Sequence, residues 1–323
     1  MTVPRGPKSA SDLGSFPLVM ISAMYENGGN TTHRILDGHP ELLVYPFESQ
    51  LGTRMVNDRW AAMYPTKYRW PVFALGADAG SHFDAIIDEE TRVRSRTPQV
   101  SKFRDHPFDM ADEERRERFV ALMGGIPFTR ANLVAAFFEA TFGAWRDVSL
   151  TGRERAWVGY SPVFGIDAEV FLSEMRHGHL LHVVRNPWSA YAETKHRPVP
   201  LRLAHYVEAW VALQAVVLAA REAVGDRITI VRFEDICDDP RAALTPFCER
   251  MRIDPAALDP LPSWNGRRLE KVFPWGTIVE ATPAANRATA AELSEAERAE
   301  VTRRARVLLD AFGYARYLET VTP

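Results

Sequence analysis

A glycine-centred turn near the start of the chain has the residue types that bind phosphate, in the stretch "YENGGNTTHRILDGHPEL". Gly28 and Gly29 allow the backbone to come close to a ligand. If a helix begins there, its free N–H groups and its dipole attract an anion without a charged side chain. Polar residues that can add hydrogen bonds flank the glycines, namely Asn27, Asn30, Thr31 and Thr32. The pattern predicts a phosphate site, with a plain strand-to-helix turn capped by threonine as the alternative.

Glu26 is the unusual member of this turn, because a phosphate site usually has Lys or Arg at such a position. The Gly-Lys-Ser/Thr ending of a Walker A loop is also absent. Two like charges in contact repel by roughly 4 kcal/mol at about 4 Å, even at the effective dielectric constant of a protein surface. We therefore expect the backbone to hold the anion. Glu26 should face away from it or pair with a cation such as Arg34 or Arg54.

A second anion site is predicted in "HLLHVVRNPWSAYAETKHR". The apolar strand there ends at Arg185, and ligands of open α/β sheets bind at the carboxyl ends of strands. Pro187 then starts a helix whose first turn carries Ser189. A guanidinium group and a helix start would together bind a phosphate, whereas a structural ion pair is the alternative for Arg185 taken alone. Two such sites at neighbouring strand ends indicate a ligand with phosphates at two ends.

Short apolar runs alternate with helical segments along the chain, which predicts an α/β fold with a parallel β-sheet flanked by helices. The runs are almost continuously apolar, as expected of strands that are covered on both faces. The expected strands are Leu18–Met24, Leu42–Pro46, Ala156–Tyr160, His179–Val184 and Ile228–Phe233. The glycine turn and Arg185 each follow one of these strands, so the sheet would position both anion sites.

Residues 17–323 are expected to form a single domain after a disordered N-terminal segment at 1–16. The stretch from about 52 to 151 is rich in helical patterns such as "SHFDAIIDEETRVR" and is interpreted as a helical insertion packed against the sheet. A last helix is expected after Ser294, because Glu297 completes a capping box with it. The Gly-, Pro- and Asn-rich segment before that helix is predicted to be a loop.

Composition limits the classes of partner. The chain has 323 residues, 46% of them hydrophobic, and a formal net charge of -3, which is typical of a globular protein. This charge gives no long-range attraction to nucleic acid, and no apolar run is long enough to predict a membrane span. Cys237 and Cys248 indicate free thiols in a reducing compartment, so we expect a cytoplasmic protein. The sequence predicts no metal site and leaves a homo-oligomer open.

Three motifs resemble those of the sulfotransferases that use 3′-phosphoadenosine 5′-phosphosulfate (PAPS). Their first motif is similar to "PRSGTTLLRRLLDGHPEL", which "YENGGNTTHRILDGHPEL" matches without a gap. Their second is like "VVRNPRDAYAS", matched here by "VVRNPWSAYAE", and "FEDICDDPRAALTPFCERMRI" resembles their third. The resemblance implies a P-loop nucleotide-kinase-like sulfotransferase fold with PAPS as co-substrate and no metal.

The resemblance also implies roles for single residues. The glycine turn would bind the 5′ phosphosulfate, and Arg185 with Ser189 would bind the 3′ phosphate. Arg287, shortly before the last helix, would close over the nucleotide as the family's last basic residue does. The chain departs from the family where Glu26 replaces the basic residue of the first motif and Glu193 replaces the serine of the second. A basic residue from elsewhere must then supply the missing charge.

Transfer of a sulfuryl group is an in-line displacement that needs a base for the acceptor. Glu48, directly after the second expected strand, is the predicted base, and His106 in "KFRDHPF" is the alternative. The sequence thus predicts a sulfotransferase that moves a sulfuryl group from PAPS to a hydroxyl or amine of a small molecule, sugar or peptide. A noncatalytic nucleotide-binding relative and a P-loop-like phosphotransferase are the alternative functions.

Overall fold

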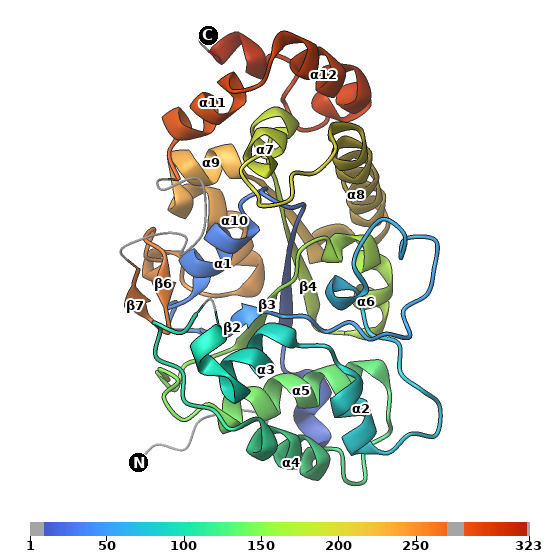
Figure 1. Ribbon diagram of the computed structural model, residues 1–323. Helices are drawn as coiled ribbons and strands as arrows, with labels where there is room; N and C mark the ends of the chain where they lie inside the picture. The colour runs from blue at the N-terminus through green and yellow to red at the C-terminus, as the bar shows by residue number, and fades with distance from the viewer. Residues whose placement is uncertain (1–9, 102, 270–280, 322–323) are drawn as a thin grey trace.

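The computed structural model describes residues 10–101, 103–269 and 281–321 (Figure 1). At its centre is a parallel sheet in the order β2-β3-β1-β4-β5. The strands are β1 (Leu18–Ala23), β2 (Leu42–Glu48), β3 (Ala156–Tyr160), β4 (Gly178–Val184) and β5 (Ile228–Arg232). The five predicted strands are confirmed, and so is the α/β class with a parallel sheet flanked by helices.

The other elements follow in chain order. The α-helices are α1 (Gly29–Leu36), α2 (Ala79–Ala85), α3 (Glu89–Arg96), α4 (Asp112–Leu122), α5 (Arg130–Ala144), α6 (Ala168–Glu174), α7 (Pro187–Thr194), α8 (Leu203–Val224), α9 (Phe233–Asp238), α10 (Pro240–Met251), α11 (Pro283–Ala291) and α12 (Glu295–Leu309). Short 3-10 helices cover Ala10–Ser15, Thr66–Tyr68, Pro98–Val100, Phe164–Asp167, Gly225–Arg227, Pro255–Ala257 and Tyr317–Thr320. A small hairpin joins β6 (Ser263–Trp264) to β7 (Arg267–Arg268).

Side chains of β1 alternate between the two faces of the sheet, which explains why the strand is apolar at nearly every position. Leu18 and Met20 enter one hydrophobic core, whereas Val19 and Ile21 enter the other. Helices α5, α6, α8 and α12 contribute to the first core, and α1, α9 and α10 contribute to the second. Because both faces are covered, the loops at the carboxyl ends of the strands are the part of the sheet that can form a binding site.

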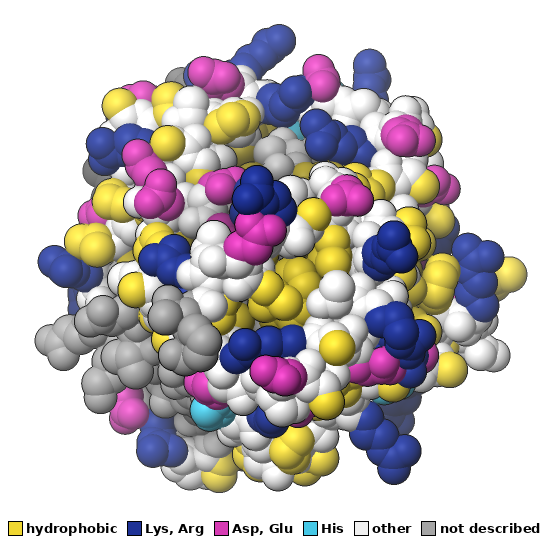
Figure 2. All heavy atoms as spheres, turned by 90° about the horizontal axis from the view of Figure 1, so that it is seen from above, with side chains coloured by type: hydrophobic (Ala, Val, Ile, Leu, Met, Phe, Trp, Pro, Cys, Tyr) yellow, Lys and Arg dark blue, Asp and Glu magenta, His cyan; other side chains and the backbone are white. Residues whose placement is uncertain are grey.

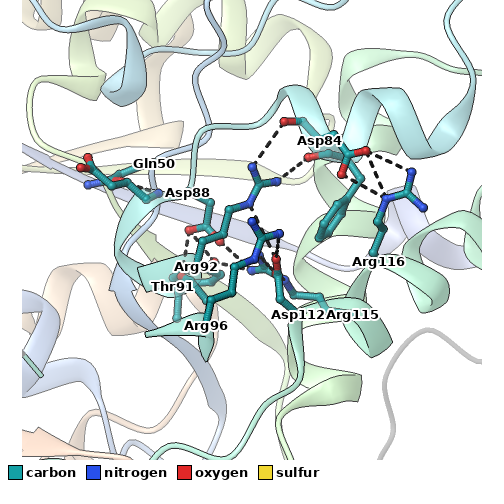
Figure 3. Close-up of polar contacts among 12 residues, drawn as sticks. Gln50, Asp84, Asp88, Thr91, Arg92, Arg96, Asp112, Arg115 and Arg116 are labelled. Carbon is teal, nitrogen blue, oxygen red and sulfur yellow. Dashed lines mark hydrogen bonds and ion pairs between the residues drawn. The ribbon is translucent and has the colours of Figure 1, made fainter. Parts of the chain in front are cut away.

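Helices α2 to α5 lie together at one end of the molecule, opposite α11 and α12 (Figure 1). A buried ion-pair network attaches them to the sheet (Figure 3). Arg115 of α4, with a side chain that is 0% exposed, pairs with Asp88 and with Asp112 at 2.6 Å in each case. Asp88 also accepts a hydrogen bond of 2.9 Å from the hydroxyl of Tyr45 in β2. The network thereby fixes α3 against the strand that carries Glu48.

β2 is an edge strand, and its pairing with β3 is irregular. Val44 pairs with Val158 and Glu48 with Tyr160, and the register shifts between these two pairs. Pro46 lies in the interval and has no N–H for the ladder, which is tolerated at a sheet edge. Glu48 is the last residue of this irregular segment and therefore reaches the carboxyl edge of the sheet.

The stretch "SHFDAIIDEETRVR" is helical, as its pattern predicts, and forms two helices, α2 and α3, because the chain turns between them at Asp88, which has a φ of 33°. One local prediction is wrong. The segment predicted as a loop before the last helix contains α11, which begins at Pro283 and is capped by the Thr282 side chain. Residues 270–280 of that segment, like 1–9 of the expected disordered segment, lie outside the described residues, while 10–15 form a 3-10 helix.

Candidate functional site

The glycine turn follows β1 and leads directly into α1. Gly28 has a φ of 84° and stands at the N-cap of α1, where it offers no side chain to the first N–H groups. Thr31, in the first turn, is 0% exposed, and its hydroxyl has no hydrogen-bond partner among the described residues. An unsatisfied buried hydroxyl costs about 1–3 kcal/mol. A ligand at this turn would satisfy both the hydroxyl and the helix start.

Glycine is required at both central positions of the turn by close aromatic neighbours. A Cβ atom on Gly28 would lie 2.0 Å from the ring of Phe233, and one on Gly29 would lie 2.5 Å from the ring of Tyr160. Both rings line the same cleft as the turn. A larger residue at either position would therefore displace a wall of the site.

Arg185 directly follows β4 and is 2% exposed. Its guanidinium group lies over the ring of Phe233, at 5.1 Å from the centroid. It donates hydrogen bonds of 2.7 Å to the carbonyl oxygen of Glu26 and of 2.7 Å to the side-chain oxygen of Asn286 in α11. Its remaining partner is the carboxylate of Glu193 in α7, at 3.4 Å. Arg185, the residue predicted to bind the 3′ phosphate, is thus held between the turn, α7 and α11.

Glu193 is the residue that departs from the family's serine, and it occupies the guanidinium group predicted to bind phosphate. Burial raises the pKa of Glu193 above its ordinary value, although the charge of Arg185 acts in the opposite direction. The separation of 3.4 Å is longer than the roughly 2.8 Å of a strong charge-assisted hydrogen bond. An anion that approaches Arg185 has to compete with this carboxylate, which is itself poorly stabilised.

The glycine turn, Arg185 and Glu48 open onto one cleft of about 760 Å³. Its lining consists of Tyr25, Glu26, Gly28, Gly29, Asn30, Thr31, Glu48, Tyr68, Tyr160, Pro162, Arg185, Glu193, His196, Arg197, Pro198, Val199 and Phe233. Six of the residues predicted from the sequence are among them: Gly28, Gly29, Asn30, Thr31, Arg185 and Glu48. The structure therefore brings both predicted anion sites and the predicted base together.

Four residues predicted to bind the nucleotide do not line the cleft, namely Asn27, Thr32, Ser189 and Arg287. The amide oxygen of Asn27 accepts the N–H of Arg185 at 3.0 Å, which joins the turn to β4. The hydroxyl of Thr32 donates to the carbonyl oxygen of Gly28, and that of Ser189 to the carbonyl oxygen of Asn286. Arg287 is exposed on α11. Asn27, Thr32 and Ser189 therefore hold residues of the site in place through hydrogen bonds without lining the cleft.

Arg197 is the cation that pairs with Glu26, so the expectation that Arg34 or Arg54 would do so is wrong. One carboxylate oxygen of Glu26 lies 2.6 Å from Nη2 and 2.8 Å from Nε of Arg197. Arg34 is buried elsewhere, where it donates to the carbonyl oxygen of Pro46 and pairs with Asp37 at 3.5 Å. Nothing in the sequence around Arg197 signals this role, because the pair forms only when the segment after α7 folds back over the turn.

Glu48 is half-buried at the end of β2 and lines the cleft. Its backbone N–H donates to the carboxylate of Glu90 at 3.2 Å, and its side chain lies near the Tyr68 hydroxyl. Burial and the nearby Glu48 raise the pKa of Tyr68, which keeps this hydroxyl protonated as a donor. The alternative base, His106, does not line the cleft and instead stacks on Trp264, with the ring centroids 4.8 Å apart.

No family model and no curated protein matches this chain. Among solved structures, it is similar to the sulfotransferase domain of the Synechococcus PCC 7002 olefin synthase, with 17% identity, a TM-score of 0.46, and 97% of this chain and 99% of that chain covered. It is also similar to the sulfotransferase domain from the curacin biosynthetic pathway, with 13% identity, a TM-score of 0.45, and 90% of this chain and 97% of that chain covered. A third such structure is a sulfotransferase from Alicyclobacillus acidocaldarius, with 14% identity, a TM-score of 0.42, and 91% of this chain and 96% of that chain covered. These similarities bear on neither the donor nor the acceptor.

A framework behind the cleft was not predicted from the sequence. Glu234, which follows β5, accepts hydrogen bonds from the side chains of Asn186, Asn286 and Tyr314. It therefore connects the third motif to the second and to α11, and it orients the amide that holds Arg185. The acidic residue of "FED" was a sequence signal for this role, whereas Asn286 had none beyond its position next to Arg287.

The described residues also bear on metal sites, membrane-spanning helices and charged surface patches. They contain no group of three or more His, Cys, Asp or Glu side chains that could hold a metal ion. One helix, around α8, is long and apolar enough to cross a membrane, but a buried core helix meets the same criterion. Figure 2 shows positive and negative side chains interspersed over one face, around a hollow with hydrophobic side chains. The described residues on this face offer a polyanion no extended patch of positive charge.

Proposed function

We propose that this protein is a sulfotransferase that moves a sulfuryl group from PAPS to a hydroxyl or amine of a small-molecule, sugar or peptide acceptor. One observation carries the proposal: the uncapped start of α1 and the unsatisfied Thr31 hydroxyl share a cleft with Arg185 and Glu48. The three sulfotransferase-like motifs favour a phosphosulfate over a plain phosphate ligand. In this proposal the turn takes the 5′ end of the nucleotide, and Arg185 takes the 3′ phosphate.

The proposed reaction assigns one step to each part of the cleft. The acceptor oxygen or nitrogen forms a bond to sulfur while the bond from sulfur to the 5′ phosphate oxygen breaks, and the electron pair stays on that oxygen. The acceptor's proton passes to the carboxylate of Glu48. The N–H groups of Gly29 and Asn30 at the helix start face the charge that grows on the departing phosphate. The hydrogen bond from its backbone N–H to Glu90 holds Glu48 at the end of β2 for this role.

A second candidate function is nucleotide binding without transfer. It is favoured by the ion pairs Arg185–Glu193 and Arg197–Glu26, which occupy the two guanidinium groups of the cleft with the protein's own carboxylates. Both candidates require nucleotide binding, so they differ only in turnover. A P-loop-like phosphotransferase has less support, because no lysine lines the cleft among the described residues.

Calorimetric titration with adenosine 3′,5′-bisphosphate, the nucleotide that remains after PAPS has lost its sulfuryl group, tests what the candidates share. We expect saturable binding at one site and a higher melting temperature. Absence of binding at millimolar concentrations would contradict both candidates. If the bisphosphate binds, its release from PAPS in the presence of phenols, amines and sugars separates them, since only the sulfotransferase releases it.

The base is tested with a matched pair of variants. Glu48→Gln should bind the bisphosphate within about twofold of the parent but turn over PAPS more slowly by a factor of about 10² or more, as is typical when a general base is lost. His106→Gln should keep its turnover, because its ring lies outside the cleft. Loss of turnover in the His106 variant but not in the Glu48 variant would show that the base is misassigned.

A further inference from the structure

Arg197 belongs to the segment that follows α7, and this segment forms one wall of the cleft. His196, Arg197, Pro198 and Val199 all line the cleft. The guanidinium group of Arg197 lies over the ring of Tyr25, 5.1 Å from its centroid, so an aromatic face supports it from one side. On another side it meets the Glu26 carboxylate. Its side chain is nevertheless 35% exposed, so the cationic group is accessible from the cleft.

Glu26 is placed for this contact by the backbone of the turn. It has a φ of 59°, in the left-handed region that non-glycine residues seldom adopt. Its carbonyl oxygen receives the hydrogen bond from Arg185, while its side chain points to Arg197. One residue thus connects both arginines of the cleft at the mouth of the glycine turn. This is an exchangeable arrangement, because the same guanidinium group can bind a carboxylate or a phosphate.

The charges around the turn also need Arg197. Among the described residues, three carboxylates line the cleft, on Glu26, Glu48 and Glu193, against two arginines. Glu193 already acts on Arg185, so without Arg197 the glycine turn would face an incoming anion with the Glu26 carboxylate alone. The Glu26 charge also raises the pKa of Arg197, against the effect of burial, which keeps this side chain fully cationic.

We infer that Arg197 binds the 5′ end of the anionic ligand at the glycine turn, and that Glu26 occupies Arg197 when no ligand is bound. This inference rests on the proposed function, because it assigns a residue to the same site. Ligand binding exchanges one anionic partner of Arg197 for another. The carboxylate of Glu26 then loses its partner and turns toward solvent. Arg197 thereby supplies the positive charge that the turn lacks in its own sequence.

Two nucleotides can test the 5′ end and the 3′ end of the site separately. Adenosine 3′,5′-bisphosphate carries both phosphates, whereas adenosine 3′-monophosphate lacks the 5′ phosphate. Arg197→Ala should weaken binding of the bisphosphate at least tenfold and leave the monophosphate within about twofold of the parent. Arg185→Ala should weaken both nucleotides. Arg197→Lys should restore part of the loss, because it keeps the charge but not the fork of donors. Arg202→Ala, an exposed arginine shortly after the same segment, is the matched control and should change neither affinity.

Glu26→Gln tests the exchange itself. Removal of the competing charge should tighten bisphosphate binding by about threefold and leave the monophosphate unchanged. In the Arg197→Ala background the same change should have a smaller effect, since the competition for Arg197 no longer exists. Equal weakening of both nucleotides by Arg197→Ala, or no weakening at all, would overturn the inference. A lower melting temperature with unchanged selectivity would mean that the pair with Glu26 is only structural.

The inference can fail separately from the proposed function. If the parent binds the bisphosphate and Arg197→Ala binds it equally well, the proposed function survives and the role of Arg197 is wrong. If the parent binds neither nucleotide, titration with inorganic pyrophosphate decides. Pyrophosphate binding that is lost in Arg197→Ala would retain Arg197 as an anion ligand and reject the nucleotide. Absence of pyrophosphate binding would overturn both proposals.

Discussion

Two arginine clusters in this protein use the same chemistry for different ends. In the helical region, Arg115 is completely buried and pairs with Asp88 and Asp112 at 2.6 Å each (Figure 3). It also donates to the hydroxyl of Tyr45. In the cleft, Arg185 is buried to nearly the same degree but meets Glu193 only at 3.4 Å. Arg115 pairs with its carboxylates at short range, whereas Arg185 pairs with its carboxylate loosely beside an open volume.

Arg115 and Arg185 show how a structural arginine differs from one that is available to a ligand. Burial alone does not separate the two, because both guanidinium groups are shielded from bulk water. The difference lies in what surrounds them. Arg115 does not line the cleft of about 760 Å³, whereas Arg185 opens onto it beside Thr31, whose buried hydroxyl has no partner among the described residues. An ion-pair network closed off from the cleft stabilises the fold, whereas an ion pair at the wall of the cleft, long at Arg185 and short at Arg197, leaves room for a ligand.

The largest effect is expected from Arg115→Ala. Loss of one partner from a buried ion pair leaves carboxylates without compensation and typically costs about 3–5 kcal/mol. We expect the free energy of unfolding, measured with urea, to fall by that amount while the folded fraction keeps its nucleotide affinity. Arg116→Ala, which removes an exposed pair with Asp84, is the control and should leave the urea midpoint nearly unchanged. A similar loss in both variants would mean that the network does not stabilise the fold.

Arg185→Ala should act on binding. Loss of a charge-assisted contact to phosphate costs about 2–3 kcal/mol, which is one to two decades in affinity for adenosine 3′,5′-bisphosphate. Titration calorimetry measures the loss directly. Because the substitution also leaves Glu193 without its partner, the double variant with Glu193→Gln should recover stability without recovering affinity. If Arg185→Ala binds as tightly as the parent, Arg185 is a structural arginine like Arg115.

Thr31→Val separates a ligand contact from a structural one. Valine has nearly the same shape, and removal of an unsatisfied hydroxyl should leave the melting temperature unchanged or raise it. The affinity for the bisphosphate should nevertheless fall about tenfold, as expected for a lost hydrogen bond to a charged group. The neighbouring Thr32→Val is the control, because the Thr32 hydroxyl already donates to Gly28. It should reduce stability more than affinity, and the opposite result would reverse the two assignments.

The smallest effect concerns pH. The pKa of Glu193 is raised by burial, so this carboxylate takes up a proton at a higher pH than an exposed glutamate does. The neutral form no longer competes for Arg185, and bisphosphate affinity should therefore rise several-fold as the pH falls through the raised pKa. Glu193→Gln should show the higher affinity at every pH. The titration of the phosphates themselves remains in this variant, so it serves as the control. Identical pH profiles for the variant and the parent would contradict the competition.

The sequence predicted the sheet well because its signal is local. Each buried strand is a mostly apolar run, and the glycines of the turn lie between one of them and the helix α1. The cap of α12 was equally visible in Ser294 and Glu297, whose reciprocal hydrogen bonds are present. The helix α11 was missed although Thr282 and Pro283 are typical start signals, because the Pro- and Asn-rich composition around them favoured a loop.

The candidate site was predictable only in part, for a physical reason. Arg185 directly follows β4, and Gly28 and Thr31 lie in the turn and first helical turn after β1, so the fold carries all three to one edge of the sheet. Arg197 and Asn286 reach the site through tertiary packing of segments far along the chain, and no spacing in the sequence reports such contacts. The substitutions at 26 and 193 were visible as departures from the family. Their meaning as ion pairs with specific arginines required the structure.

The irregular end of β2 has a consequence for how this protein meets other copies of itself. An edge strand normally presents a row of free N–H and C=O groups that a strand from a neighbouring molecule can extend. Here Pro46 removes one donor, and the shift of register between Val44 and Glu48 interrupts the row. A foreign strand could therefore follow the edge for only a few residues before losing alignment. The same interruption that brings Glu48 to the cleft also leaves a strand from another copy few groups to pair with along this buried edge.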